Sequence, residues 1–190
     1  MPTTGELAVV QLLQAIGEDP QRPGLVDTPG RVVRALLELT SGYADNPAAI
    51  LARVFPDEYD EMVVVRGVAF TSLCEHHLLT FTGTAVVGYL PAPGRGVVGL
   101  SKLARLVDAY ARRLQVQERM TMQIADAMVE HLQPLGVGVV LRARHSCMGC
   151  RGVRKPAAEM VTSALRGAMR DQADTRAEFL ALARTPCEDR

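Results

Sequence analysis

Most of the metal-binding side chains of this sequence lie in two short segments. The first, 73–83, reads LCEHHLLTFTG, and the second, 145–152, reads HSCMGCRG. Together they hold three of the four histidines and three of the four cysteines. Cys74 and His77 are separated by two residues, a spacing that lets a thiolate and an imidazole bind one ion from a single turn. A further ligand from the second segment would complete a site that only the folded chain can assemble.

These side chains allow either a structural or a catalytic zinc site. A closed Cys3His site would use all four candidate ligands and do no chemistry; they are Cys74, His77, Cys147 and Cys150. If only three bind, a water takes the fourth position, and zinc lowers the pKa of that water towards about 7, so that it can attack as hydroxide. His76 and His145 favour the catalytic alternative, because imidazoles beside such a water are suited to proton transfer.

The composition is that of an ordinary globular protein. The 190 residues suffice for one large domain with a helical extension, and 48% are hydrophobic. The 21 Lys and Arg balance the 21 Asp and Glu, so overall charge favours neither nucleic acid nor membrane as a partner. We find no signal peptide and no long apolar run, and therefore expect a cytoplasmic protein. In a reducing compartment, clustered Cys and His indicate metal ligands rather than disulfides. Cys187, in the terminal TPCEDR, is expected to be exposed and without a role.

The pattern of hydrophobic residues predicts an α+β protein. The first forty residues are predicted to form two helices, with Thr28 as N-cap and Pro29 as first residue of the second. Further helices are expected after Ser101, at 117–133 and at 176–183. Strands are expected at 61–72, 81–91, 137–145 and 153–165. This order predicts a four-stranded antiparallel sheet with its helices on one face.

Two basic groups lie on predicted helices. Ser101 is expected to cap a helix whose Lys102 and Arg105 lie near its positive end, where they could bind an anion. The segment is not a phosphate-binding P-loop, because Ser101 stands where that motif requires glycine. Arg31 and Arg34 share one face of an earlier helix. For both groups the alternative is a solvated basic surface.

Other candidate residues flank the second metal-binding segment or begin a helix. If the strand before the second segment continues for two more residues, His145 and Cys147 project from the same face and could address one ion and its water. Arg151, next to Gly152, could reach an anionic substrate. Glu118 stands with Gln117 at the start of a helix, where a carboxylate ordinarily stabilises the helix dipole.

Four motifs in this order resemble those of GTP cyclohydrolase I. They are CEHHL at 74–78, GLSKLAR at 99–105, RRLQVQER at 112–119, and HSCM followed by RGV within 145–153. The resemblance runs from about residue 17 to residue 184. It implies a hydrolase that converts GTP and water into 7,8-dihydroneopterin triphosphate and formate, the first step of tetrahydrofolate or other pterin synthesis.

The resemblance also implies a role for each candidate residue. Zinc would be held by Cys74, His77 and Cys147. His145 would protonate the ring nitrogen, and His76 would transfer protons during ring opening and ribose rearrangement. The guanine edge would be bound by Gln117 and Glu118. The triphosphate would be bound by Ser101, Lys102, Arg105 and Arg151, with Arg31 and Arg34 nearby.

The fold implied by the resemblance is the tunnelling fold, in which sheets assemble into a barrel. The implied partner is the chain itself, as a homodecamer with active sites between subunits. The implied division is a helical region at 1–58, a catalytic domain at 59–184 and a tail at 185–190. Thr80, where the family often has proline, and Cys150 depart from the family pattern. Two alternatives remain: a module with a closed zinc site, and a tunnelling-fold relative such as the nitrile reductase, which uses a reactive cysteine and a nicotinamide cofactor.

Overall fold

The computed structural model describes residues 1–184 as an α+β structure, which confirms the predicted class. The helices are α1 (Thr4–Ala15), α2 (Thr28–Leu39), the 3-10 helix η1 (Ser41–Ala44), α3 (Pro47–Leu51), α4 (Leu100–Ala111), α5 (Gln117–Leu132), α6 (Ser146–Gly149), α7 (Ala168–Asp171) and α8 (Ala173–Arg184). The strands are β1 (Val54–Phe55), β2 (Val63–Cys74), β3 (Thr80–Leu90), β4 (Val97–Val98), β5 (Leu114–Gln115), β6 (Gly136–His145) and β7 (Met160–Gly167). Cys187 lies outside the described residues. Within residues 1–184, no helix has both the length and the apolar character needed to cross a lipid bilayer.

The main sheet has the strand order β5-β2-β3-β6-β7, with one strand more than predicted. Its four long strands pair antiparallel, whereas the two-residue β5 pairs parallel with the end of β2, placing Gln115 opposite Cys74. A strand of two residues has no alternating pattern that a sequence could reveal. This short strand matters for the site because it ties the start of α5 to the end of β2.

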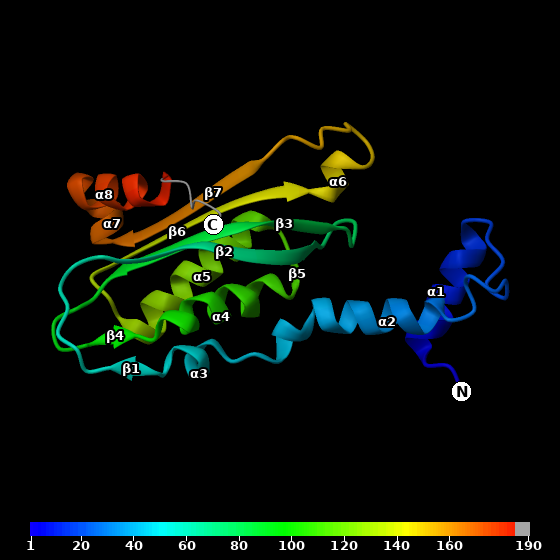
Figure 1. Cartoon of the computed structure of the whole chain (residues 1–190), viewed down its shortest axis with the longest axis horizontal. Helices are drawn as coiled ribbons and strands as arrows, with labels where there is room; N and C mark the ends of the chain where they lie inside the picture. The colour runs from blue at the N-terminus through cyan, green and yellow to red at the C-terminus, as the bar shows by residue number, and fades with distance from the viewer. Residues whose placement is uncertain (185–190) are drawn as a thin grey trace, which may run out of the picture.

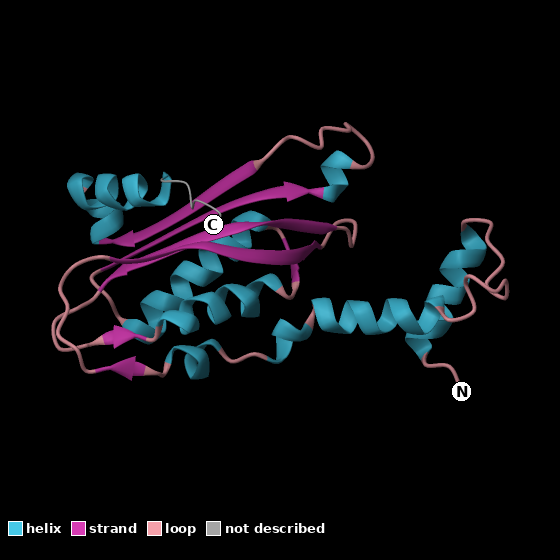
Figure 2. Cartoon of the chain, viewed as in Figure 1, coloured by secondary structure: helices cyan, strands magenta, loops and turns pink. Residues whose placement is uncertain are grey.

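Helices α4 and α5 cover one face of the sheet (Figure 2). The inward positions of the central strands alternate along the chain and are fully buried, as at Ala85 and Val87 in β3 and Val139 and Leu141 in β6. Burying such a row of side chains against two helices supplies the main hydrophobic stabilisation of the fold.

The opposite face of the sheet is also partly covered, so the prediction of helices on one face only was wrong. Helices α7 and α8 lie over one end of it (Figure 1), where Phe179 and Met169 pack against Val86 and Val140. Phe179 is fully buried because Gly88 and Gly138, which are opposite each other in β3 and β6, leave room for its ring.

The N-terminal helices project away from the sheet (Figure 1). Helix α1 has no buried residue and packs mainly against α2. Helix α2 begins at Thr28 with Asp27 in the N-cap position, so the predicted cap was wrong by one residue. Ser101 likewise lies inside the first turn of α4, where Gly99 takes the N-cap position.

Candidate functional site

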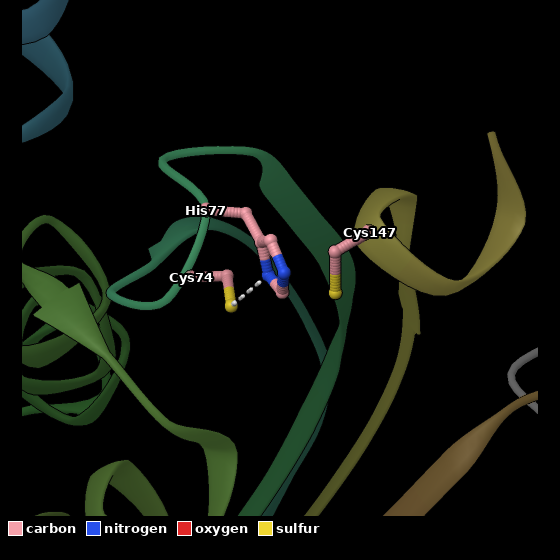
Figure 3. Close-up of side chains that lie close together, drawn as sticks. All are labelled: Cys74, His77 and Cys147. Atoms are coloured by element: carbon pink, nitrogen blue, oxygen red, sulfur yellow. Dashed lines mark hydrogen bonds between the residues drawn. The ribbon is translucent and has the colours of Figure 1, made fainter. Parts of the chain in front are cut away.

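The structure brings three of the predicted ligands together at one end of the sheet. The ligand atoms of Cys74, His77 and Cys147 all lie within 4.8 Å of one another (Figure 3). Cys74 ends β2, and the turn that follows is closed by hydrogen bonds from the backbone N–H groups of His77 and Leu78 to the Cys74 carbonyl. This turn places Nδ1 of His77 4.0 Å from Sγ of Cys74.

The third candidate ligand lies on a short helix that directly follows β6. Strand β6 ends at His145, and the chain then forms the one-turn helix α6, which carries Cys147. The strand predicted at 137–145 is thus confirmed, and Cys147 is carried by a helix and not by a continued strand. Cys150, at the end of this turn, is exposed and lies outside the group of three donors.

The three donors suit zinc. Two sulfurs and one imidazole nitrogen form a set that Zn²⁺ prefers, and their mutual separations are compatible with bonds of about 2.0–2.3 Å to one ion after a small contraction. Burial raises the pKa of the Cys147 thiol, and the neighbouring Cys74 raises it further. A dication between the two sulfurs would stabilise both thiolates and so offset the two effects that raise this pKa.

A cavity of about 440 Å³ adjoins the two cysteines. It is lined by Cys74, His76, Gln115, Val116, Gln117, Glu118, His145, Cys147 and Met160. The cavity therefore brings together side chains that the sequence places in three separate motifs. Glu118, which is exposed in the first turn of α5, supplies a carboxylate at its wall.

His145 is held firmly inside this cavity. Its ring stacks on Phe81 with centroids 4.5 Å apart and an interplanar angle of 4°. Its Nε2 lies 2.9 Å from Oε1 of Gln117. Burial lowers the pKa of the imidazole, while the carboxylate of Glu118 acts in the opposite direction. A proton carrier in this position would be oriented by protein contacts on its face and at one nitrogen.

Gln117 lines the cavity, but its side-chain amide is engaged within the protein. The residue is 1% exposed, and Nε2 donates to the carbonyl oxygens of Leu141 and Met160 and to the hydroxyl of Thr162. This arrangement differs from the expectation that Gln117 binds a guanine edge.

Two further side chains complete the surroundings of the metal ligands. Nδ1 of His76 lies 3.9 Å from Sγ of Cys74, and most of the His76 side chain is exposed. Nη1 of Arg151 lies 3.2 Å from Nε2 of His77, which places a guanidinium beside the ligand group.

Sequence reasoning missed an ion pair that fastens the metal-binding turn to α5. Both Nη atoms of Arg119 donate to the carboxylate of Glu75, at 2.6 and 2.9 Å, and these bonds lower the pKa of Glu75. The backbone N–H of Glu75 also donates to the carbonyl of Gln115. Both partners stand inside quoted motifs, but their pairing is a tertiary contact without a local signal.

The remaining predicted residues lie away from this cavity. Helix α4 has 12 residues and leads at its end into β5, beside Cys74, so its first turn lies about 18 Å away along the helix. Figure 1 shows α4 starting at the far end of the sheet. The residues not brought to the cavity of this chain are Ser101, Lys102, Arg105, Arg31 and Arg34. Arg31 is exposed and pairs with Asp27.

Comparison with known proteins gives consistent matches. The family model described as GTP cyclohydrolase I matches residues 5–184. The chain is 55% identical to a GTP cyclohydrolase 1 of Thermobifida fusca, over 93% of this chain and 86% of the relative. It is 56% identical to a GTP cyclohydrolase 1 of a Janthinobacterium species, over 92% of this chain and 88% of the relative. A crystal structure of an archaeosine synthase QueF-Like in the apo form has a TM-score of 0.48 and 16% identity, covering 58% of this chain and 97% of that one.

Proposed function

We propose that this chain, which belongs to the GTP cyclohydrolase I family, is a zinc-dependent hydrolase that converts GTP and water into 7,8-dihydroneopterin triphosphate and formate. The observation that carries the proposal is the single cavity in which Cys74 and Cys147 lie with His76, His145 and Glu118. A reaction that opens an imidazole ring needs an activated water, proton carriers and a way to orient the purine. This cavity contains side chains for each task.

Zinc would be held by Cys74, His77 and Cys147, and Cys150 would stay free. When bound, it supplies a Lewis acid that makes water a competent nucleophile near neutral pH. The three-donor group leaves room for that role, whereas a fourth thiolate would not. The exposed position of Cys150, outside the group, supports the open site over the closed one.

Glu118 is the group proposed to orient the substrate. A carboxylate can accept hydrogen bonds from the ring N–H and the exocyclic amino group of guanine together, which adenine does not offer. Its exposed carboxylate at the cavity wall supports this role.

His145 is proposed to protonate the ring nitrogen as the ring opens, and His76 to carry protons in the later steps. His145 is half-buried and oriented by its contacts, which suits a donor that must meet one atom of the substrate. His76 is largely exposed, which suits exchange of protons with water. Arg151, beside His77, is placed to meet a phosphate.

The triphosphate site is proposed to come from a second copy of the chain. Ser101, Lys102 and Arg105 lie too far from the cavity of their own subunit to reach a nucleotide bound there. An assembly in which the first turn of α4 from one subunit faces the cavity of another would bring the two halves together. This arrangement supports the proposed homo-oligomer, for which the family resemblance implies a decamer, with Arg31 and Arg34 contributed in the same way.

The direct test is to incubate the zinc-loaded protein with GTP and follow formate release and pterin fluorescence. We expect product from the parent and from Cys150→Ser at equal rates, and loss of product when a chelator removes zinc. Absence of product from the parent, with activity gained in Cys150→Ser, would show instead that Cys150 closes the zinc site.

A further inference from the structure

We propose that Gln117 is a positioning residue that holds His145 in one orientation and one tautomer, and that it does not bind the substrate. This inference rests on the proposed function, because it specifies how the proposed proton donor is prepared. It follows from the hydrogen bonds of Gln117, each of which has only one workable direction.

The amide nitrogen of Gln117 is fixed by the groups that face it. It lies 3.2 Å from the carbonyl oxygen of Leu141 in β6 and 3.1 Å from that of Met160 in β7. Carbonyl oxygens only accept hydrogen bonds, so the atom facing them must be the NH2 group. Rotating the amide by half a turn would put its oxygen against two carbonyls and leave buried donors without partners.

Two threonines reinforce this orientation. The hydroxyl of Thr121 donates its single hydrogen to the backbone carbonyl of Gln117 at 2.7 Å. In the 2.6 Å contact between Thr121 and Thr162, the hydrogen must therefore come from Thr162. The oxygen of Thr162 is then an acceptor for Nε2 of Gln117, 3.1 Å away. The two hydrogens of Nε2 thus face three acceptors, so one hydrogen is shared between two of them, and none of the three can be replaced by a donor.

With the amide nitrogen fixed, Oε1 of Gln117 must face His145. An amide oxygen only accepts, so Nε2 of His145 must carry the hydrogen in their 2.9 Å contact. The neutral imidazole then has its free lone pair on Nδ1, and stacking on Phe81 restrains the plane of the ring. Nδ1 is therefore the nitrogen that takes up and delivers the catalytic proton.

The same bonds make Gln117 unsuitable as a substrate contact. Its side chain is 1% exposed, and both hydrogens and the oxygen are already used. Binding a guanine through this amide would break its existing hydrogen bonds to the carbonyl oxygens of Leu141 and Met160. The neighbouring carboxylate of Glu118 is exposed at the cavity and carries no such cost.

Steady-state kinetics of Gln117→Met and Glu118→Gln separate the two roles. Met has a similar length but cannot accept a hydrogen bond from the imidazole. We therefore expect kcat to fall by about 10- to 100-fold, which is part of the usual contribution of an acid–base group. KM for GTP should stay nearly unchanged. Glu118→Gln should instead act mainly on KM and on kcat/KM. Gln11→Met, an exposed glutamine on α1, is the matched control and should leave both constants unchanged. A rise in KM with unchanged kcat in Gln117→Met, or no change in either constant, would overturn the proposal.

Nitrogen-15 NMR of the zinc-loaded protein labelled at its four histidines tests the tautomer without GTP. At a pH where the imidazole is neutral, His145 should show a protonated Nε2 and an unprotonated Nδ1, identified by loss of its signals in His145→Gln. Gln117→Met should shift these signals towards a mixture of tautomers. A protonated Nδ1 in the parent protein would refute the assignment. If the parent shows the expected tautomer but releases no formate from GTP, the proposed function fails while the assignment of Gln117 stands.

Discussion

The packing of Phe179 against two paired glycines leads to a quantitative prediction for Gly138→Ala. A methyl group added at Gly138 would lie 2.5 Å from Cε1 of Phe179 and 2.7 Å from Cδ1. Gly138 does not have a positive φ, so an alanine meets no backbone strain there. The cost of the substitution must therefore come from the contact with the aromatic ring.

Relieving this contact requires a shift of about 1 Å, because non-bonded carbon atoms prefer separations of about 3.5–4.0 Å. Overpacking of this kind costs about 1–3 kcal/mol, which for a chain of this length lowers Tm by about 2–12 °C. Phe179→Ala alone should cost about 3–5 kcal/mol, since the ring is fully buried. Adding Gly138→Ala to Phe179→Ala should change the free energy of unfolding by less than about 0.5 kcal/mol, because the ring that it clashes with is gone.

A double-mutant cycle measured by thermal or urea unfolding tests this, with all variants at one protein concentration because oligomers are stabilised by association. The cycle should give a coupling free energy equal to most of the cost of Gly138→Ala. Additive effects of the two substitutions would refute the reasoning, since the cost would then not arise at the ring. GTP turnover measured well below Tm should be retained in both single variants.

Three predictions concern the chemistry. Glu118→Gln should lower kcat/KM for GTP by about 100-fold or more, because the amide has one acceptor oxygen instead of two and carries no charge. Metal analysis should find the zinc content unchanged. Cys147→Ser should lose zinc in an equilibrium competition with a chelator and release no formate; retention of zinc would exclude Cys147 as a ligand. The Lys102→Ala and Cys147→Ser variants should each be inactive alone. If each site is shared by two subunits, co-expressing the two variants should restore about a quarter of the sites, because such a site then takes its Cys147 from one variant and its Lys102 from the other. No recovery in the mixed protein would mean that the two residues act within one subunit.

Two of the three candidate metal ligands could be predicted to lie together because their spacing is local. Cys74 and His77 lie in one turn, and a Cys-x2-His pattern requires little from the rest of the chain. The choice between three and four ligands could not be made in the same way. It depends on how the chain turns after His145, where a helix of four residues leaves Cys150 exposed. Four residues carry no periodic signal, so the sequence could not show whether the strand predicted at 137–145 continues or is followed by a helix.

The features that the sequence did not reveal are contacts between distant segments. The bonds of Gln117 to β6 and β7 join residues 24 and 43 positions apart. A buried glutamine at a helix start has the same sequence signature as an exposed one. A helix was predicted at 176–183, but its place on the second face of the sheet was not. That place depends on the pairing of Gly88 with Gly138, which is set by strand register and not by local sequence.

The candidate site and the packing of Phe179 lie at different ends of the sheet. The register of β3 with β6 places Phe81 opposite His145 at one end and Gly88 opposite Gly138 towards the other, about 24 Å away along the strand. The functional side chains stand where strands end or α5 begins, so the regular strands fix their positions while their own ends remain open to the cavity. Phe179 packs at the distant end, so we expect a substitution there to change the free energy of unfolding and to leave the position of His145 unchanged. A shift of the β3–β6 register by one residue would instead remove Phe81 from the face of His145, so the stability of the sheet and the role proposed for His145 both require this register.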